Sequence, residues 1–236
     1  YYKRRYLDLK TTSLPLQTTR RINANRWEFS LQGMKDIKRT FEAIKFDKNI
    51  QDLSLILASD HKFSNKELLH LAHSLKDLKL LKRVTMKFLG SGLTDVGLSS
   101  VAKWLSRFPL LQSFSSLSSF RDCQVTNAGL YHLSRALKKI TFLKEIKLQC
   151  LHDCLTDNGL YRLNGSFSRL ARLEKIILLV PSSRYITDRS LMSLDFKRLV
   201  FLQEVQLEFI YFSLTDRGLS FLTETLEGLP NLQKIK

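Results

Sequence analysis

The chain has 236 residues, 44% of them hydrophobic, and a formal net charge of +16 at pH 7. No apolar run approaches the roughly 20 residues that a membrane-spanning helix needs, so we expect no membrane span. Three cysteines do not make a disulfide framework, which favours a location inside the cell, either cytoplasmic or organellar.

The first 24 residues are predicted to form an extended basic arm ahead of the folded domain. Aromatic residues alternate with its cations, and Pro15 interrupts it. Such cations displace counterions from a phosphate backbone, and aromatic rings stack on bases. The arm would equally suit an acidic protein such as the tails of tubulin, and an ordinary solvated flanking segment is the alternative. The predicted partner-binding residues of the arm and its junction are Lys3, Arg4, Arg5, Lys10, Arg20, Arg21 and Arg26.

Residues 25–236 are predicted to form one solenoid, which begins with a degenerate unit over residues 25–57. Ile37, Phe41 and Ile44 have the spacing of one face of a helix. A strand with alternating apolar residues is predicted to follow, near Leu53 and Leu55. We therefore expect one helix and one strand in this stretch.

A motif of the form Leu-Thr-Asp-x-Gly-Leu then occurs in six copies, most clearly at residues 93–98. Its Ser or Thr positions lie 28 to 32 residues apart, a period typical of stacked repeats. Thr followed by Asp or Asn suits a helix start, because the hydroxyl caps free N–H groups and the carboxylate faces the positive end of the helix dipole. The six positions are Ser64, Thr94, Thr126, Thr156, Thr187 and Thr215.

Apolar residues keep a fixed order after each motif. Leu130, Leu133 and Leu137 follow the spacing of a helix, whereas Ile146 and Leu148 alternate as in a strand. Each repeat therefore predicts one helix followed by one strand. A glycine often lies three residues after the Thr, where a side chain would obstruct the packing of one helix start on the next. These glycines are Gly97, Gly129, Gly159 and Gly218.

This pattern resembles the leucine-rich repeats of the ribonuclease-inhibitor type, in segments such as Leu143-x-x-Ile146-x-Leu148 and in the motif that follows them. The resemblance covers residues 63–236, and divergent arrays of this kind look similar to those expanded in some protists. It implies an α/β fold, a horseshoe-shaped solenoid of about seven helix–strand repeats with a parallel concave sheet. No Asn recurs in the turn after each strand, where the family has its asparagine ladder.

The chain ends at Lys236, inside the stretch where a seventh strand is expected. A solenoid needs its last repeat covered, because an apolar flank and a strand edge otherwise remain exposed. We therefore expect the solenoid either to continue beyond residue 236 or to be capped by a partner.

The strands are predicted to present a mixed surface on the concave side. Lysine and arginine alternate there with acidic and hydroxyl side chains, so the face offers no uniform track for phosphates. A protein is the expected ligand of this face. Its predicted partner-binding residues are Arg83, Lys87, Lys147 and Lys175.

A second set of cations recurs near the ends of the predicted helices and is expected to line up along one edge of the convex side. Cations at helix ends complement the helix dipole, which explains part of this recurrence. A long row of a single sign also suits an acidic partner. We call this set the convex stripe, and it consists of Lys76, Lys79, Lys103, Arg107, Arg135, Lys138, Lys139, Arg169, Arg172, Lys197 and Arg198.

Patterns that would indicate catalysis do not occur in the sequence. It contains no Gly-rich phosphate loop, no zinc-protease helix motif and no nucleophile elbow. Cys150, His152 and Cys154 alternate, but they form no CxxC pair, and a closed zinc site usually needs four ligands. We therefore predict that the chain is no enzyme and that it holds neither metal nor cofactor.

Together these features predict a noncatalytic protein-interaction scaffold, a subunit of a multi-subunit complex that docks on acidic partners through the basic arm and the convex stripe. RNA or tubulin are the acidic polymers considered. One alternative is an RNA-contacting structural component of a ribonucleoprotein, for example an organellar ribosome. A further alternative is the regulatory or substrate-recruiting part of a larger enzyme.

Overall fold

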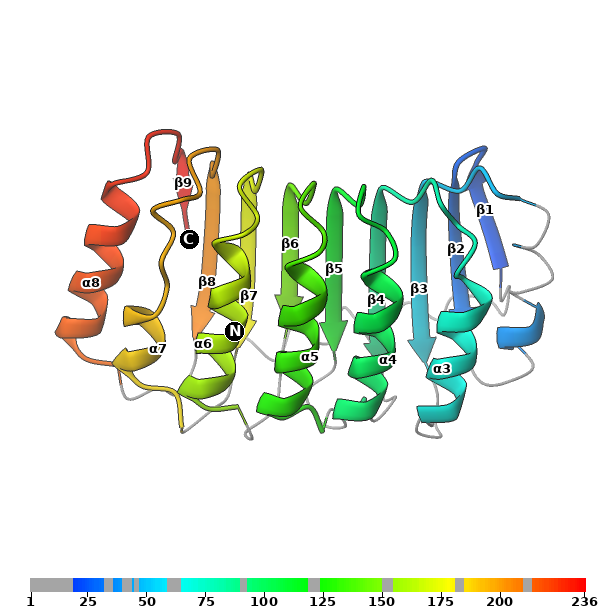
Figure 1. Cartoon of the computed structure of the whole chain (residues 1–236), viewed down its shortest axis with the longest axis horizontal. Helices are drawn as coiled ribbons and strands as arrows, with labels where there is room; N and C mark the ends of the chain where they lie inside the picture. The colour runs from blue at the N-terminus through cyan, green and yellow to red at the C-terminus, as the bar shows by residue number, and fades with distance from the viewer. Residues whose placement is uncertain are drawn as a thin grey trace, which may run out of the picture.

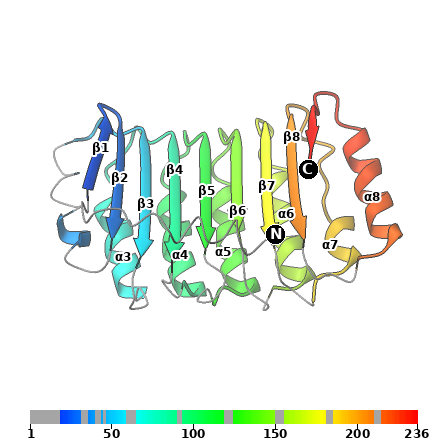
Figure 2. The ribbon, with the colours of Figure 1, turned by 180° about the vertical axis from the view of Figure 1, so that it is seen from behind.

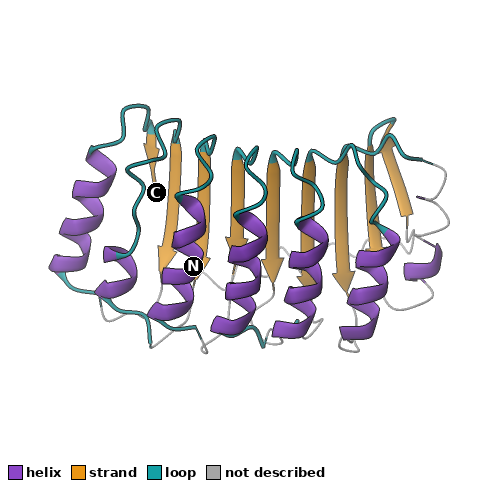
Figure 3. Ribbon diagram, in the orientation of Figure 1, coloured by secondary structure: helices purple, strands orange, loops and turns teal. Residues whose placement is uncertain are grey.

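A computed structural model describes residues 19–31, 36–39, 44, 47–58, 65–89, 93–118, 124–149, 155–180, 185–209 and 214–236. Within these ranges, nine strands form one sheet, in which spatial order follows chain order. The first two strands are antiparallel, and all later pairs are parallel. Helices cover one face of the sheet (Figures 1 and 3), and Figure 2 shows the opposite face, which the described helices leave uncovered.

The labelled elements alternate along the chain after the opening hairpin. The strands are β1 (Thr19–Asn23), β2 (Arg26–Leu31), β3 (Asp52–Ala58), β4 (Arg83–Leu89), β5 (Ser113–Ser118), β6 (Glu145–Gln149), β7 (Lys175–Val180), β8 (Glu204–Phe209) and β9 (Lys234–Ile235). The helices are α3 (Asn65–Ser74), α4 (Asp95–Leu105), α5 (Asn127–Leu137), α6 (Asp157–Phe167), α7 (Asp188–Met192) and α8 (Asp216–Glu227).

Equivalent residues of successive repeats lie side by side in the sheet. Ile146 of β6 pairs with Ile176 of β7, which in turn pairs with Val205 of β8. A helix follows each strand from β3 to β8 and returns the chain to the start of the next strand (Figure 1). The predicted fold is confirmed: the chain forms an α/β leucine-rich-repeat solenoid with a parallel sheet.

The sheet begins before the first strand that the sequence pattern predicts. Trp27, Phe29 and Leu31 alternate along β2, and the last two are fully buried. This alternation is the signal that could have revealed the strand. The predicted boundary between arm and solenoid, after residue 24, lies in the turn between β1 and β2. Residues 1–18 of the predicted arm lie outside the described part of the chain.

The hydrophobic core lies between the sheet and the helices. Leu130, Leu133 and Leu137 of α5 are at most 1% exposed, and Ile146 and Leu148 of β6 at most 2%. Burial of one such side chain contributes roughly 1.5–3 kcal/mol relative to exposure. Because a single repeat cannot enclose its own apolar face, this burial requires stacked neighbours.

A row of hydrogen bonds joins the start of each helix to the start of the next. Asp95, the first residue of α4, accepts bonds from the backbone N–H of Thr126 at 2.7 Å and of Gly129 at 2.8 Å. Its second oxygen accepts a bond from the Thr126 hydroxyl at 2.7 Å. We call this row the helix-start ladder, and its rungs are Asn65–Thr94, Asp95–Thr126, Asn127–Thr156, Asp157–Thr187 and Asp188–Thr215.

The ladder explains the recurring glycine of the motif. A Cβ atom built at Gly129 would lie within 3 Å of the Asp95 carboxylate, and one at Gly218 would meet the preceding rung in the same way. The prediction that a side chain would obstruct packing at these positions is confirmed. Ser190 replaces the glycine in one repeat, where its hydroxyl donates a hydrogen bond to Asp157 instead.

Candidate functional site

The outward-facing residues of the strands line up in rows across the concave face, because neighbouring strands pair in register. The first row alternates in charge over much of its length, so the predicted mixture of charges on this face is confirmed. From β2 to β9 it consists of Arg26, Asp52, Arg83, Ser113, Glu145, Lys175, Glu204 and Lys234.

Two of the four predicted concave contacts have a carboxylate partner within the chain. Arg83 binds Asp52 at 2.6 Å, and the Lys175 ammonium lies 2.8 Å from Glu204. Lys234 approaches the same carboxylate at 3.5 Å. The hydrogen bond from Lys175, followed by the charges of both lysines, lowers the pKa of Glu204 below its usual range. This carboxylate therefore neutralises part of the concave face.

The other two predicted concave contacts, Lys87 on β4 and Lys147 on β6, are half-buried. Neither forms an ion pair with any described residue. Lys87 and Lys147 therefore retain uncompensated charge on the concave side.

The described part of the arm contacts the solenoid itself. Arg21 of β1 lies 3.7 Å from Asp47, and its guanidinium stands 5.6 Å from the centre of the Trp27 ring. Arg20 lies in β1, and Arg26 opens β2 with an exposed side chain. The remaining predicted arm residues lie outside the described part of the chain, and they are Lys3, Arg4, Arg5 and Lys10.

The convex stripe lies along the edge where the helices end, at the top of Figure 1. Lys76 is half-buried, and every other member is exposed. No member forms an ion pair with a carboxylate of the described residues, although Asp77 and Asp195 occupy the same turns. The stripe is therefore an uncompensated row of positive charge.

Large apolar side chains accompany this stripe in the turns that follow the helices. Each stands immediately before the first buried leucine of the next strand segment, at the same position of its repeat. Arg172 occupies that position between β6 and β7, with its guanidinium 4.2 Å from the centre of the Phe142 ring. The apolar members and their exposed fractions are Leu80 (50%), Leu110 (55%), Phe142 (37%) and Phe201 (55%).

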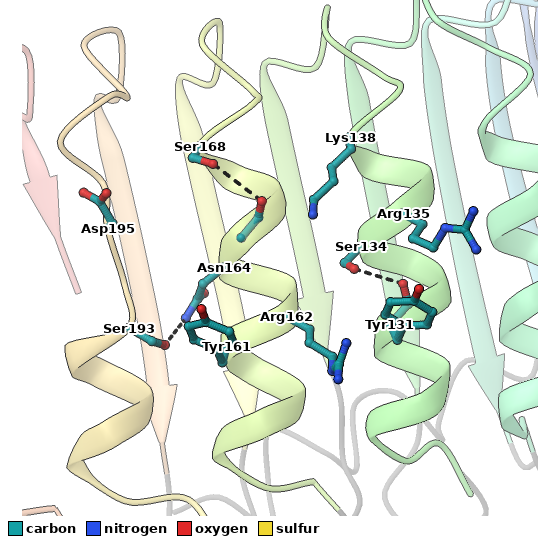
Figure 4. A pocket seen from close by; sticks show the side chains of 11 residues that line it. Tyr131, Ser134, Arg135, Lys138, Tyr161, Arg162, Asn164, Ser168, Ser193 and Asp195 are labelled. Carbon is teal, nitrogen blue, oxygen red and sulfur yellow. Dashed lines mark hydrogen bonds between the residues drawn. The ribbon is translucent and has the colours of Figure 1, made fainter.

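A groove of about 400 Å³ lies on the convex side, between α5, α6 and the segment after α7 (Figure 4). Tyr131 and Arg135 of α5 border it, together with Tyr161 and Arg162 of α6. The guanidinium groups of Arg135 and Arg162 stand 5.8 and 5.1 Å from the centre of the Tyr131 ring. Of the lining residues, only Arg135 and Lys138 belong to a surface that the sequence predicts.

The lowered pKa values of Asp188 and Glu204 have structural explanations. The hydroxyl of Thr215, then its N–H, lowers the pKa of Asp188, as Lys175 does for Glu204.

Within the described ranges, no three His, Cys, Asp or Glu side chains are placed to hold a metal ion. The segment from Cys150 to Cys154 lies outside those ranges. Among the described helices, none has the length and apolar character needed to cross a membrane.

No family model and no curated protein matches the chain. Solved structures of the leucine-rich-repeat type are similar to it. The C-terminal domain of a tropomodulin from Caenorhabditis elegans is 11% identical, with a TM-score of 0.49 over 70% of this chain and 92% of that one. The actin-binding site 2 of leiomodin-1 is 16% identical, with a TM-score of 0.45 over 63% of this chain and 80% of that one.

A structure of the Rad7 and Elc1 complex from yeast contains a chain that is 16% identical, with a TM-score of 0.36 over 88% of this chain and 68% of that one. These likenesses concern overall fold at low identity. The leucine-rich-repeat assignment rests on the repeats, the parallel sheet and the helices of this chain.

Proposed function

We propose that the chain is a noncatalytic scaffold subunit of a larger intracellular assembly, and that its convex stripe docks on an acidic protein. The observation that carries this proposal is the uncompensated positive charge of the stripe. A row of cations that form no ion pair with the described carboxylates gains most from an external surface of opposite sign.

The apolar residues of the same edge favour a protein over a nucleic acid. Leu80 and Leu110 are aliphatic, and aliphatic side chains do not stack on bases as aromatic rings do. Exposed apolar side chains among arginines and lysines are instead suited to a protein interface. The partner that fits this edge is therefore a protein with acidic side chains around apolar contacts.

Two finer assignments belong to the same proposal. We assign the repeats to the ribonuclease-inhibitor type, on the basis of the helix in each repeat and the Leu-x-x-Leu-x-Leu segments. The basic arm, with Lys3, Arg4, Arg5 and Lys10, is proposed to extend the docking surface of the stripe.

Charge-matched variants test the proposal. A stripe variant replaces Lys103, Arg107 and Lys139 by Gln. A control variant replaces Lys66, Arg189 and Arg217, three exposed cations near helix starts. Binding of a glutamate-rich protein is titrated at about 50 to 200 mM salt, with mixed-sequence RNA as a parallel ligand.

We expect the stripe variant to bind the acidic protein about tenfold more weakly than the control variant does. Equal affinities of the two variants would show that net charge alone governs binding and would refute the stripe as a docking site. Tighter binding of RNA than of the acidic protein at the same salt concentration would favour the ribonucleoprotein alternative instead.

A further inference from the structure

The convex groove arises from a difference between two helices that otherwise repeat each other. Tyr131 and Arg135 of α5 and its C-cap residue Lys138 line the groove. They lie thirty positions before Tyr161 and Gly165 of α6 and its C-cap residue Ser168. The tyrosine is common to both helices, but α6 lacks the two long cationic side chains. Their replacement by glycine and serine leaves a space beside α6 into which Lys138 extends (Figure 4).

Gly165 has no packing reason to be glycine. A Cβ atom built there would meet no heavy atom of the described residues within 4 Å, in contrast to Gly129 on the helix-start ladder. Glycine inside a helix lowers stability relative to alanine. Gly165 therefore keeps a surface open at a cost to its own helix, which is a pattern expected of a binding site.

The far side of the groove exists because α7 is short. This helix has 5 residues, whereas α6 has 11, and the chain leaves the helical path after Met192. Ser193 and Asp195 then line the groove where a longer helix would continue. Figure 4 shows this segment beside α6, with Ser193 turned toward Asn164.

The amide of Asn164, which is buried at the groove, has an oxygen that accepts no hydrogen bond from a described residue. Asn164 is 5% exposed, and its Nδ2 donates a hydrogen bond to the Ser193 hydroxyl at 2.8 Å. That hydroxyl donates in turn to the carbonyl of Ser190 at 2.7 Å, so it can only accept from the amide. The orientation of the amide is thereby fixed, and Oδ1 of Asn164 has no hydrogen-bond partner among the residues that the structure describes. A buried acceptor in this state is unfavourable until a donor reaches it.

The groove has the chemistry of a receptor for acidic peptide. Three cations, Arg135, Lys138 and Arg162, line it together with one carboxylate, Asp195. Tyr161 is 65% exposed and offers a ring on which an apolar side chain can pack. An inorganic anion would satisfy the cations but would bring no N–H group for Asn164. An extended peptide supplies both acidic side chains and backbone N–H groups.

We propose that this groove binds an acidic peptide segment of the partner protein. Its carboxylates contact Arg135, Lys138 and Arg162, and a backbone N–H approaches Oδ1 of Asn164 after a small adjustment of the floor. The inference rests on the proposed function and adds a defined pocket to the convex stripe.

Gly165→Met tests the groove without a change of charge. The methionine side chain would extend into the open space and occlude it, while non-specific attraction to a protein of net charge +16 would persist. A fluorescent glutamate-rich peptide is titrated into the full chain at about 150 mM salt, and anisotropy reports binding. We expect Gly165→Met to weaken binding about tenfold, and Gly165→Ala, the matched control, to bind within about threefold of wild type.

A second variant addresses the cations. Arg162→Gln removes a groove cation outside the convex stripe, and Arg189→Gln removes an exposed cation outside the groove. We expect a loss of about tenfold for the first variant and little change for the second. Thermal unfolding of all four variants shows whether each is folded at the temperature of the titration.

The outcomes separate the groove from the wider proposal. Equal binding by wild type and Gly165→Met, with weaker binding by the stripe variant, would refute the groove and leave the stripe standing. No binding of acidic peptide or acidic protein by the wild type would refute both. Selective loss in Gly165→Met and Arg162→Gln supports the groove.

Discussion

The carboxylate of Asp157 accepts a hydrogen bond from the hydroxyl of Ser190, at the helix position that Gly159 and Gly218 occupy in the repeats on either side. From α4 to α8, the side chain at this position is therefore either absent or donates to the preceding rung of the helix-start ladder. The rule concerns contacts between repeats, because the acceptor belongs to one helix and the donor to the next.

Two glycine-to-alanine substitutions in neighbouring helices are expected to act in opposite directions. Gly129→Ala places a methyl group against the Asp95 carboxylate and should destabilise the fold by about 1–3 kcal/mol. Gly165→Ala meets open space and should stabilise it by up to about 1 kcal/mol. Urea unfolding of the two variants measures both effects. Changes of the same sign would contradict the distinction between a ladder glycine and a groove glycine.

Removal of one rung is expected to weaken the array. Asp95→Ala takes the acceptor from three hydrogen bonds with the next repeat and should cost about 2–4 kcal/mol in the free energy of unfolding. Asp95→Asn is the matched control, because Asn127 occupies the equivalent position of the next repeat. We expect the asparagine variant to lose less than half as much. A loss of equal size in both variants would show that charge, not bonding, matters at this position.

The last described rung makes stability dependent on pH. The hydroxyl of Thr215, its backbone N–H and the charge of Arg217 lower the pKa of Asp188 below its usual range. A carboxyl group with a lowered folded-state pKa stabilises the fold above its unfolded-state value, and this contribution is lost as pH falls through the folded-state pKa.

Asp188→Asn should remove that dependence. The difference in unfolding free energy between wild type and variant is expected to be constant from about pH 7 to pH 5 and to shrink below about pH 4. Urea titrations at a series of pH values measure it. A difference that remains constant down to about pH 2 would contradict the assignment.

The concave lysines are expected to differ in reactivity. Lys175 is held by Glu204 at 2.8 Å, whereas Lys147 forms no ion pair with a described residue. Acetylation of Lys147 should therefore be a few times faster than that of Lys175, as mass spectrometry of tryptic peptides can measure. Glu204→Gln should raise the rate at Lys175 and leave Lys147 unchanged. Equal rates at both lysines in the wild type would contradict the ion pair.

The repeat architecture could be predicted because local sequence patterns determine it. Thr at a helix start, apolar residues at helix spacing and an alternating strand occur together in successive repeats, and the structure follows them from β3 onward. The β1–β2 hairpin was missed because it does not repeat. The local signal of β2 is the alternation of Trp27, Phe29 and Leu31.

Contacts between repeats were less accessible from sequence. The motif showed Asp157 at a helix start, but its bonds to Thr187 and Ser190 depend on how two helices stack. The ion pairs of the concave face depend in the same way on strand register. One feature of the sequence does indicate the groove. Thr187 and Thr215 are only 28 positions apart, so the repeat between them is the shortest. That shortening falls in α7, where the groove opens.

The helix-start ladder also limits how such an array can change in length. Each rung spans a boundary, so one repeat contributes the acceptor and the next contributes the hydroxyl and the small residue. Duplication or deletion of a whole unit, from one Asp to the next, recreates every rung. A cut at any other length would leave a carboxylate opposite the wrong residue. Unequal recombination can therefore lengthen or shorten this protein only by whole repeats. Residues in the loops and on the outer faces of the helices, which form no rung, can diversify freely.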